Sequence, residues 1–345
     1  MLRQLCLTNH AISRIRASIV TRRPSSTKQH DPLRILFCGA DQFSIYSLRA
    51  LHDLQQARSN IIAAIDVLCR PDKRVGRGLK RVQEVPIKPV ATTLGLQLHQ
   101  VDTFKGWQSP SIYDLIITVS FGLLVPARIL NAARYGGLNV HPSLLPAFRG
   151  PAPIQRAMLE RAEKTGVTLQ TMHPTRFDHG ALLSRSPTLA SPYTLQLDEV
   201  IETLGTAGAK LLVEGICDGL FVPPVQPLEP ISEVATYAAK ITPEDRHIDW
   251  QKWTSEDVTV RDRVLSNLWD SEDPRGKRRI YHGPWRVLNG LARGQQPGMA
   301  LPLEGEIGFC TIDDKLMVPS SITIEGRRHH MLKCAHICLE NPISK

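Results

Sequence analysis

Short apolar runs and stretches with helical spacing alternate along the first two thirds of the chain. The runs are residues 33–38, 61–68, 113–119 and 136–140. Apolar side chains with helical spacing follow the first run at 44–54 and return at 198–217. Apolar runs that alternate with helices are typical of a parallel sheet with helices on both faces. The pattern predicts a Rossmann-like, doubly wound α/β domain, whose ligands bind outside the carboxyl ends of the strands.

The pattern changes after residue 222. Four prolines fall between Val222 and Pro230, which favours a stiff, extended linker between domains over a surface loop within one domain. Short strand-like runs between residues 280 and 324 are separated by Gly and Pro, and they predict a smaller β-barrel-like (OB-like) domain. We therefore expect an α/β domain at 31–222, a linker at 223–240 and a second domain at 241–345.

Charge is spread unevenly along the chain. There are 42 basic and 33 acidic residues, a formal net charge of +9, but residues 1–30 hold six of the basic residues and none of the acidic ones. Arg-rich, acid-free leaders that can form an amphipathic helix are typical of mitochondrial transit peptides. We expect residues 1–30 to direct the protein to the mitochondrial matrix; a disordered arm that binds nucleic acid is the alternative.

Composition narrows the class of protein further. Hydrophobic residues make up 42% of the chain and charged residues 22%, which excludes a disordered or collagen-like protein. No apolar run reaches the roughly 18 residues that span a bilayer, so we expect no membrane association. The seven scattered cysteines fit free thiols in a reducing compartment.

Two acid-poor clusters remain in the body of the chain. Residues 70–81 contain six basic residues, one acidic residue and two glycines, and they predict a mobile basic loop after the second apolar run. Residues 274–303 contain six basic residues and no acidic one, with Tyr281 and Trp285 among them. Such clusters bind RNA phosphates in a salt-dependent manner. Either cluster alone could equally be a solvated surface, but together they favour RNA.

Polar side chains gather where predicted strands end. Asn139 and His141 lie two apart at the end of the fourth run, so both point to the same side of the sheet. Asp178 follows an apolar run that begins at Val167. An amide and an imidazole can stabilise the oxyanion of a tetrahedral intermediate, and an aspartate can orient the imidazole or accept a proton. Together the three residues predict acyl transfer to an amine, whereas each alone would be an ordinary structural residue.

The sequence lacks the motifs of several other kinds of site, namely dinucleotide-binding, P-loop, zinc and nucleophile-elbow sites. The turn after the first run carries Gly39 but not the second and third glycines of a dinucleotide site. The chain has no P-loop lysine motif, and Cys334 and Cys338 lack the spacing of a zinc knuckle. No serine or cysteine near His141 has a nucleophile-elbow setting, which disfavours a hydrolase with a covalent intermediate. We expect no metal site.

The stretch around His141 resembles a known family. From Asn139 to Ile154 it reads Asn-x-His-Pro-Ser-Leu-Leu-Pro-x-x-Arg-Gly-Pro-Ala-Pro-Ile, which is similar to the signature of the folate-dependent formyltransferases. The resemblance runs from about residue 33 to residue 250. Ala235-Thr-Tyr-Ala-x-Lys240 and the second domain place the chain nearest to the mitochondrial members that act on methionyl-tRNA. Around Asp178 the chain reads Arg-Phe-Asp-His-Gly, as in organellar members, rather than the bacterial Gly-Leu-Asp-Thr-Gly.

The resemblance implies transfer of the formyl group of 10-formyltetrahydrofolate to the α-amino group of initiator methionyl-tRNA, with Asn139, His141 and Asp178 as catalytic residues. It implies a folate-binding set of Phe121, Gly122, Ser143, Leu144, Leu145 and Pro146. It implies a tRNA-binding set of Lys73, Arg74, Arg77, Lys80, Arg81, Lys240, Arg278 and Arg279. We expect a monomer. The alternatives are a folate-dependent formyltransferase or hydrolase with a small acceptor, and an RNA-binding protein without catalysis, which the complete catalytic set disfavours.

Overall fold

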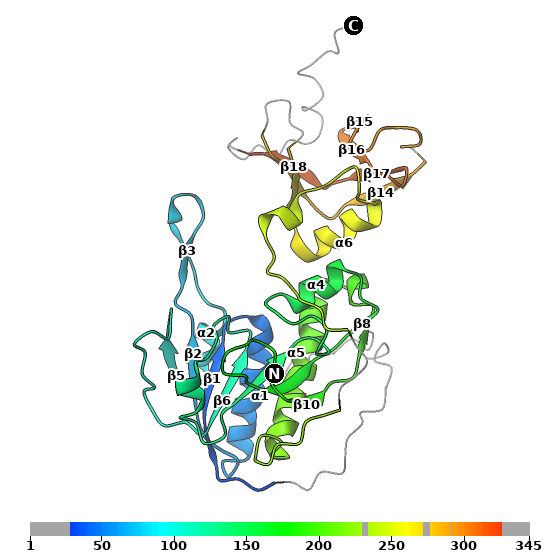
Figure 1. Cartoon of the computed structure of the whole chain (residues 1–345). Coiled ribbons are helices and arrows are strands. Elements are labelled where there is room, and N and C mark those ends of the chain that lie inside the picture. Colours follow the sequence, from blue (N-terminus) through cyan, green and yellow to red (C-terminus); the bar gives the residue numbers. More distant parts are fainter. Residues whose placement is uncertain (1–27, 230–233, 272–276, 291, 326–345) are drawn as a thin grey trace, which may run out of the picture. The chain divides into compact units, whose positions relative to one another are not determined.

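The computed structural model describes residues 28–229, 234–271, 277–290 and 292–325 (Figure 1). The chain divides into two compact units. The first ends at Lys240 and the second begins at Ile241, with residues 158–160 grouped with the second. Most of the expected leader, the Cys334 and Cys338 pair and one basic residue of the second cluster, Arg275, lie outside the described residues. The expected domain boundaries stay a prediction, although the change of unit falls where the predicted linker ends.

A seven-stranded sheet forms the centre of the first unit, in the order β10-β9-β7-β6-β1-β2-β5. In that order the strands are β10 (Leu182–Arg185), β9 (Thr168–Thr171), β7 (Gly137–His141), β6 (Leu115–Val119), β1 (Leu33–Gly39), β2 (Ile62–Cys69) and β5 (Gln97–Gln100). The strands from β7 to β5 are parallel, whereas β9 is antiparallel to β7 and β10 to β9. The α/β expectation is confirmed, with the correction that the sheet is mixed at one edge.

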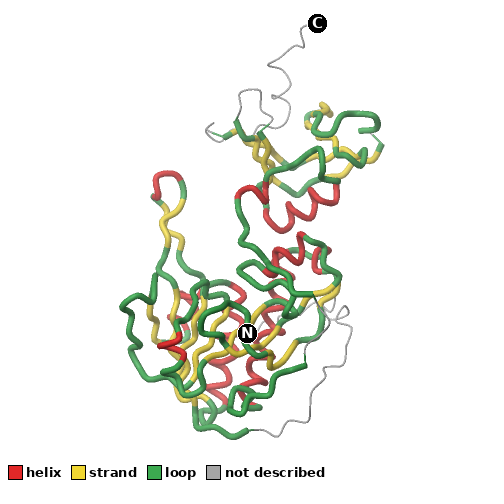
Figure 2. Tube along the Cα trace, in the orientation of Figure 1, coloured by secondary structure: helices red, strands yellow, loops and turns green. Residues whose placement is uncertain are grey.

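Helices and loops cover both faces of this sheet (Figure 2). The helices are α1 (Gln42–Ala57), α2 (Ile87–Thr93), α3 (Ala127–Leu130), α4 (Pro153–Leu159) and α5 (Leu197–Cys217). The Asp41 side chain caps α1 by accepting a hydrogen bond from the Ser44 N–H. Helix α5 lies close to the sheet, since a Cβ on Gly208 would be 3.1 Å from Val140 Cγ1. The opposite face is covered by an apolar cluster that includes Phe104 and Ile129.

Strand register places one row of side chains at the carboxyl edge of the sheet. Cys38 pairs with Thr118, Thr118 with Asn139, and Asn139 with Gln170. Directly paired residues on neighbouring strands project to the same face of a sheet. Val140 faces α5, so Asn139 and His141 on either side of it face away from α5. The sheet therefore brings an amide, a hydroxyl and an imidazole to one face at one edge.

The predicted basic loop is an antiparallel hairpin. Strands β3 (Lys73–Val75) and β4 (Arg81–Gln83) pair, and the 3₁₀ turn η2 (Arg77–Leu79) joins them. The expectation of irregular structure is wrong because Gly76 and Gly78 adopt the positive φ angles, 80° and 71°, that close the turn. At the base, Asp72 accepts hydrogen bonds from the Val85 N–H (3.0 Å) and Lys88 Nζ (2.5 Å). The bond from Lys88, followed by that from Val85, lowers the pKa of Asp72.

The first described residues are bound to the first unit. Lys28 Nζ donates to the carbonyl oxygens of Val222 (2.7 Å) and Pro224 (2.5 Å). The Lys28 N–H donates to the carbonyl of Asp218 at 3.3 Å, just beyond α5. The His30 ring lies 5.1 Å from the ring of Phe221. Residues 28–30, which were assigned to the leader, therefore belong structurally to the folded body.

The proline-rich segment also stays close to the first unit at its described ends. The Leu228 N–H donates to the carbonyl of Leu182 in β10 at 2.7 Å. Further on, Tyr237 forms an isolated parallel bridge with Arg149.

The first unit also contains two short elements away from the central sheet. They are the 3₁₀ turn η3 (Pro192–Thr194) and the antiparallel pair of β8 (Lys164–Thr165) and β11 (Leu189–Ala190).

The second unit contains two antiparallel sheets and one helix in its described part. It begins with the 3₁₀ turn η4 (Pro243–Arg246) and α6 (Ser255–Leu265). One sheet is β12 (Leu268–Asp270), β13 (Arg279–His282) and β18 (Ser321–Ile324). The other is β14 (Arg286–Asn289), β17 (Lys315–Val318), β16 (Glu306–Cys310) and β15 (Ala300–Leu303). The predicted small β-rich domain is confirmed.

Among the described residues, no helix is both long and apolar enough to cross a membrane. The described cysteines Cys38, Cys69, Cys217 and Cys310 are free thiols. Within the same ranges, no cluster of three or more His, Cys, Asp or Glu side chains could hold a metal ion.

Candidate active site

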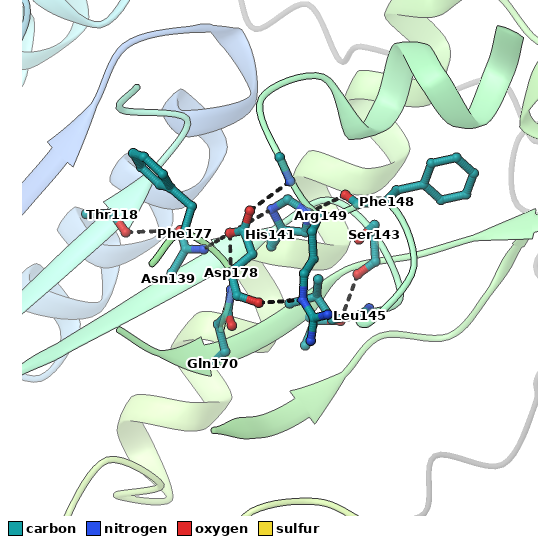
Figure 3. Close-up of polar contacts among 12 residues, drawn as sticks. Thr118, Asn139, His141, Ser143, Leu145, Phe148, Arg149, Gln170, Phe177 and Asp178 are labelled. Atoms are coloured by element: carbon teal, nitrogen blue, oxygen red, sulfur yellow. Dashed lines mark hydrogen bonds and ion pairs between the residues drawn. The ribbon is translucent and has the colours of Figure 1, made fainter. Parts of the chain in front are cut away.

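Asn139, His141 and Asp178 meet at the carboxyl edge of β7 (Figure 3). Asn139 Nδ2 donates a hydrogen bond to Asp178 Oδ1 at 3.1 Å. His141 Nδ1 lies 3.4 Å from the same oxygen. His141 is buried and Asn139 is half-buried, so the amide is the more accessible of the two. The structure brings together the three side chains that the sequence singled out.

Thr118 sets the direction of the Asn139 amide. The Thr118 hydroxyl donates to Asn139 Oδ1 at 3.0 Å, which leaves the amide nitrogen facing Asp178. An amide nitrogen carries two hydrogens, and only one is needed for the bond to Asp178. The second hydrogen can donate to a substrate oxygen.

Asp178 accepts hydrogen bonds from several directions. Oδ1 receives Gln170 Nε2 at 3.3 Å besides Asn139 and His141, and Oδ2 receives the Gly150 N–H at 2.9 Å. Its own backbone has φ of 55°, the left-handed conformation, in which aspartate is better tolerated than most residues. The Arg149 Nε–H donates to the Asp178 carbonyl oxygen at 2.9 Å. These contacts fix both the side chain and the backbone of Asp178.

Gly180 allows the Asp178 turn to approach β9. A Cβ at this position would lie 1.6 Å from the Thr171 carbonyl oxygen. The Gly180 N–H donates to Gln170 Oε1 at 3.2 Å, so Gln170 binds both ends of the turn from Asp178 to Gly180. The turn requires glycine here because any side chain would displace it from the sheet.

The second ring nitrogen of His141 faces the loop that follows β7. His141 Nε2 lies 2.9 Å from the carbonyl oxygen of Phe148, and a protonated Nε2 donates to that oxygen. The two ring nitrogens therefore face a carboxylate and a carbonyl, so an imidazolium would donate from both. In this arrangement both ring nitrogens of His141 have a polar neighbour, one in the Asp178 turn and one in the loop after β7.

The predicted folate residues divide into buried and accessible positions. Ser143, Leu144, Leu145 and Phe121 are buried. The Ser143 hydroxyl donates to the Ala147 carbonyl at 2.6 Å, and the Leu145 N–H donates to Thr168 Oγ1 at 3.0 Å. Pro146 is half-buried and Gly122 is exposed. Ser143 and Leu145 therefore shape the loop, and Phe121 belongs to the apolar cluster beneath it.

The predicted tRNA-binding residues of the first unit lie on the hairpin, except for Lys240, which is the last residue of the unit. Lys73, Arg74, Lys80 and Arg81 are exposed, and Arg77 lies in the turn η2. Exposed apolar side chains, Leu79 and Val82, stand among them. Lys240 is exposed, and its carbonyl oxygen accepts from Arg156 Nη2 at 3.1 Å.

In the second unit the two predicted arginines have different environments. Arg279 donates to both oxygens of buried Asp270, at 2.7 and 2.8 Å. Trp250 Nε1 (2.8 Å) and the Tyr281 hydroxyl (2.5 Å) donate to the same carboxylate. Arg279 is therefore the ion-pair partner of a buried carboxylate, and its assignment to the RNA-binding set stays a prediction. Arg278 is half exposed and lies 4.2 Å over the Trp269 ring.

Several residues of the site were not found from the sequence. Thr118 and Gln170 could have been found only with the strand register, which pairs both with Asn139. Phe148 and Gly150 lie within the recognised motif, but they act through backbone groups that their identity does not reveal.

Comparison with known proteins identifies the class of this fold and site. Residues 33–216, more than half of the chain, match the family model described as Formyl transferase. A sugar N-formyltransferase from Shewanella is similar in fold, with a TM-score of 0.53 at 18% identity, covering 71% of this chain and 95% of that one. HypX from Aquifex aeolicus in complex with tetrahydrofolic acid gives a TM-score of 0.51 at 16% identity, covering 85% of this chain and 44% of that one.

Sequence relatives narrow the class. The mitochondrial methionyl-tRNA formyltransferase of Saccharomyces cerevisiae is 32% identical over 321 residues, covering 78% of this chain and 79% of the relative. The methionyl-tRNA formyltransferase of Enterococcus faecalis is 36% identical over 228 residues, covering 64% of this chain and 68% of the relative. The chain therefore belongs to the formyl transferase family, in its methionyl-tRNA formyltransferase branch.

Proposed function

We propose that the protein transfers the formyl group of 10-formyltetrahydrofolate to the α-amino group of initiator methionyl-tRNA in the mitochondrial matrix. The observation that carries the chemistry is the meeting of Asn139, His141 and Asp178 at the carboxyl edge of the sheet. There the free hydrogen of the Asn139 amide can face a reacting carbonyl. The acceptor and the compartment follow from the similarity to the yeast enzyme and from the acid-free leader.

The transfer needs a neutral amine, a polarised formyl carbonyl and a place for one proton. 10-Formyltetrahydrofolate supplies the formyl group. The amine of methionyl-tRNA attacks the formyl carbon, the bond from that carbon to N10 then breaks, and tetrahydrofolate leaves with a proton on N10. Asn139 donates its second amide hydrogen to the oxyanion that develops, and one such donor contributes roughly 3–4 kcal/mol to transition-state stabilisation. The hydroxyl of Thr118 keeps the amide in the orientation that makes this possible.

We infer that Asp178 orients rather than accepts the proton of the amine. Asn139 and Gln170 donate to its Oδ1, with His141 Nδ1 3.4 Å from the same oxygen, and the Gly150 N–H donates to Oδ2. Most acceptor sites of the carboxylate are therefore used within the protein. Held in this way, Asp178 fixes the Asn139 amide and the His141 ring at once. In this scheme water carries the proton from the attacking amine to N10 of the departing tetrahydrofolate.

The folate is proposed to bind at the same edge, where ligands of doubly wound sheets lie. Gly122 and Pro146 are the accessible members of the proposed set, and they would contact the pterin directly. Ser143, Leu144, Leu145 and Phe121 would act by holding the loop and the sheet edge in shape.

The tRNA is proposed to bind through the hairpin residues Lys73, Arg74, Arg77, Lys80 and Arg81, together with Lys240 and Arg278. Exposed cations that contact phosphates release counterions, which makes binding depend on salt concentration. Exposed Leu79 and Val82 give the hairpin an apolar surface that could contact bases or riboses. We propose that the protein acts as a monomer.

The experiment is a formylation assay with the purified full chain. It supplies 10-formyltetrahydrofolate and one of three acceptors: methionyl initiator tRNA, free methionine amide or water alone. Formylmethionyl-tRNA as the main product supports the proposal. Formylation of the small amine without the tRNA product, or release of formate alone, would replace it with the small-acceptor or hydrolase alternative.

A further inference from the structure

Residues 236–238, which we term the clamp segment, lie beside the active-site loop. The Phe148 N–H donates to Thr236 Oγ1 at 2.8 Å, and the Arg149 N–H donates to the Thr236 carbonyl at 3.0 Å. The Ala238 N–H donates back to the Arg149 carbonyl at 2.6 Å. The clamp segment therefore pairs with the loop like a short parallel strand.

The part of the loop that the clamp segment holds also contacts the catalytic residues. The Phe148 carbonyl faces His141 Nε2, the Arg149 guanidinium binds the Asp178 carbonyl, and the Gly150 N–H binds the Asp178 carboxylate. Three consecutive loop residues thus contact His141 and Asp178 with one set of atoms and the clamp segment with another.

The hydroxyl of Thr236 has a distinct place in this arrangement. Phe148 has φ of 56°, a left-handed conformation that is unfavourable for a residue with a side chain. The hydroxyl receives the N–H of this same residue, whose carbonyl faces His141. The Thr236 hydroxyl thus holds the peptide group before Phe148, and the Thr236 carbonyl holds the one after it through the Arg149 N–H. The hydroxyl thereby fixes the left-handed turn at Phe148 that directs the carbonyl to the imidazole.

Packing on the other side of the loop shows how close the two segments are. A Cβ on Gly150 would lie 2.7 Å from Tyr237 Cε2 and 2.8 Å from the Ala238 carbonyl oxygen. The loop and the clamp segment therefore have no space between them for independent movement at this point. A change in the position of the clamp segment must therefore also move the loop.

We propose that Thr236 is a positioning residue for the transfer reaction: through the Phe148 peptide, its hydroxyl sets the orientation of the His141 imidazole. The inference rests on the proposed function, because it assigns a role within that reaction. Thr236 touches neither His141 nor Asp178, so its effect is carried by the loop.

The test compares Thr236→Val, which removes the hydroxyl and keeps the branched shape, with Thr236→Ser, which keeps the hydroxyl. The matched control is Thr203→Val, whose hydroxyl binds a helix carbonyl on α5 away from the site. Steady-state formylation of methionyl-tRNA gives kcat and both KM values. The ring nitrogen signals of His141 are followed by NMR in ¹⁵N-histidine-labelled protein, assigned with His141→Gln.

We expect Thr236→Val to lower kcat about 5- to 30-fold, because one hydrogen bond that orients the loop is lost, with KM for the folate changed less than about 2-fold. Thr236→Ser should return kcat to within about 2-fold of the natural protein. The His141 Nε2 signal should shift in the valine variant alone, at an unchanged unfolding temperature.

A valine variant with natural kcat, or a loss that serine does not restore, overturns the proposal. A change confined to KM for the tRNA also overturns it, since that result would make Thr236 a tRNA contact. If the natural protein formylates no methionyl-tRNA, the function proposed above fails instead. The NMR comparison then decides the positioning role by itself, and an unchanged His141 signal in Thr236→Val rejects it.

Discussion

At the scale of single residues, the proposed reaction depends on the Asn139 amide, which uses one hydrogen inside the protein and keeps the other for substrate. Asn139 uses one for Asp178, and Thr118 holds the amide in the orientation that frees the other. Replacing Asn139 with alanine should therefore lower kcat about 10²- to 10³-fold, the usual effect of losing an oxyanion donor. Thr118→Val should have a smaller effect, because it removes only the orientation.

The measurement is single-turnover formylation with both substrates saturating. Binding of methionyl-tRNA by filter retention serves as the control and should stay within about 2-fold, since Asn139 has no phosphate-binding group. A loss that appears only in KM, with kcat intact, would show that Asn139 binds substrate without stabilising the transition state.

Asp178→Asn replaces one oxygen acceptor with an NH₂ donor. Asn139, Gln170 and the Gly150 N–H all donate to this carboxylate. One of them must then face another donor, and we expect a loss of about 1–3 kcal/mol in the free energy of unfolding as well as a loss of activity. Urea unfolding measures the first effect. An asparagine variant of natural stability whose pH–rate profile alone changes would instead identify Asp178 as the base.

Asn139, His141 and Asp178 could be proposed as a site from the sequence, but the residues that hold them in place could not. The spacing of Asn139 and His141 predicts a shared face from chain geometry alone. The contact between Phe148 and Thr236 joins residues 88 positions apart, so no local sequence pattern could predict it. Gln170 becomes visible only when β9 is placed antiparallel beside β7, and the sequence pattern predicted parallel strands.

At the scale of elements, the basic segment predicted as a mobile loop is a paired hairpin, which changes how it would bind RNA. Two strands fix the exposed cations relative to one another, and Asp72 ties the base to α2 through Lys88. We expect the double variant Arg74→Ala with Lys80→Ala to reduce the slope of log affinity against log salt by about 1–2. Lys105→Ala, which removes one exposed cation outside the hairpin, is the control and should leave the slope unchanged.

Asp72→Asn tests the attachment of the hairpin to α2 through Asp72 and Lys88, and leaves the phosphate-binding cations in place. It should raise KM for methionyl-tRNA while kcat at saturation stays near the natural value, because the cations remain but their base is loosened. The pKa of Asp72 in the folded protein is lowered by Lys88, so the ionised anchor stabilises the hairpin above the ordinary aspartate pKa. That contribution is lost as the pH falls through the lowered pKa. Equal KM values at neutral pH would show that the hairpin does not need this anchor.

The hairpin was misread because charge dominated its sequence. Lys73-Arg-Val and Arg81-Val-Gln are short strands on either side of a turn with two glycines, a pattern that indicates a hairpin. The strands β5, β12 and β15 were also missed, since each has only three or four residues. In addition, β5 is mostly polar and β15 contains Pro302, a residue that argues against a strand.

At the scale of the whole molecule, the second unit is built around one buried carboxylate. Asp270 is 1% exposed and is neutralised by Arg279. Arg279→Ala should destabilise the second unit by about 3–5 kcal/mol, because it leaves a buried charge without its partner. Arg278→Ala, one residue away and half exposed, is the matched control and should change stability by less than about 1 kcal/mol.

Thermal unfolding followed by Trp fluorescence measures this difference. Trp250 and Trp285 lie in the core of the second unit, so they report on it. If the two variants melt together, Arg279 is not needed for the core.

The contacts of Lys28 restrict where the mature chain can begin. If the leader is removed, as the proposed mitochondrial function requires, the cut has to fall before this residue for the hydrogen bonds to Val222 and Pro224 to survive. A recombinant chain that starts at Thr27 should therefore melt a few degrees above one that starts at Asp31, about 2–4 °C for each kcal/mol in a protein of this size. Lys28→Met in the longer chain should reproduce most of the loss. Mass spectrometry of the natural protein would give its amino terminus. That position shows whether the mature chain keeps Lys28 and its hydrogen bonds.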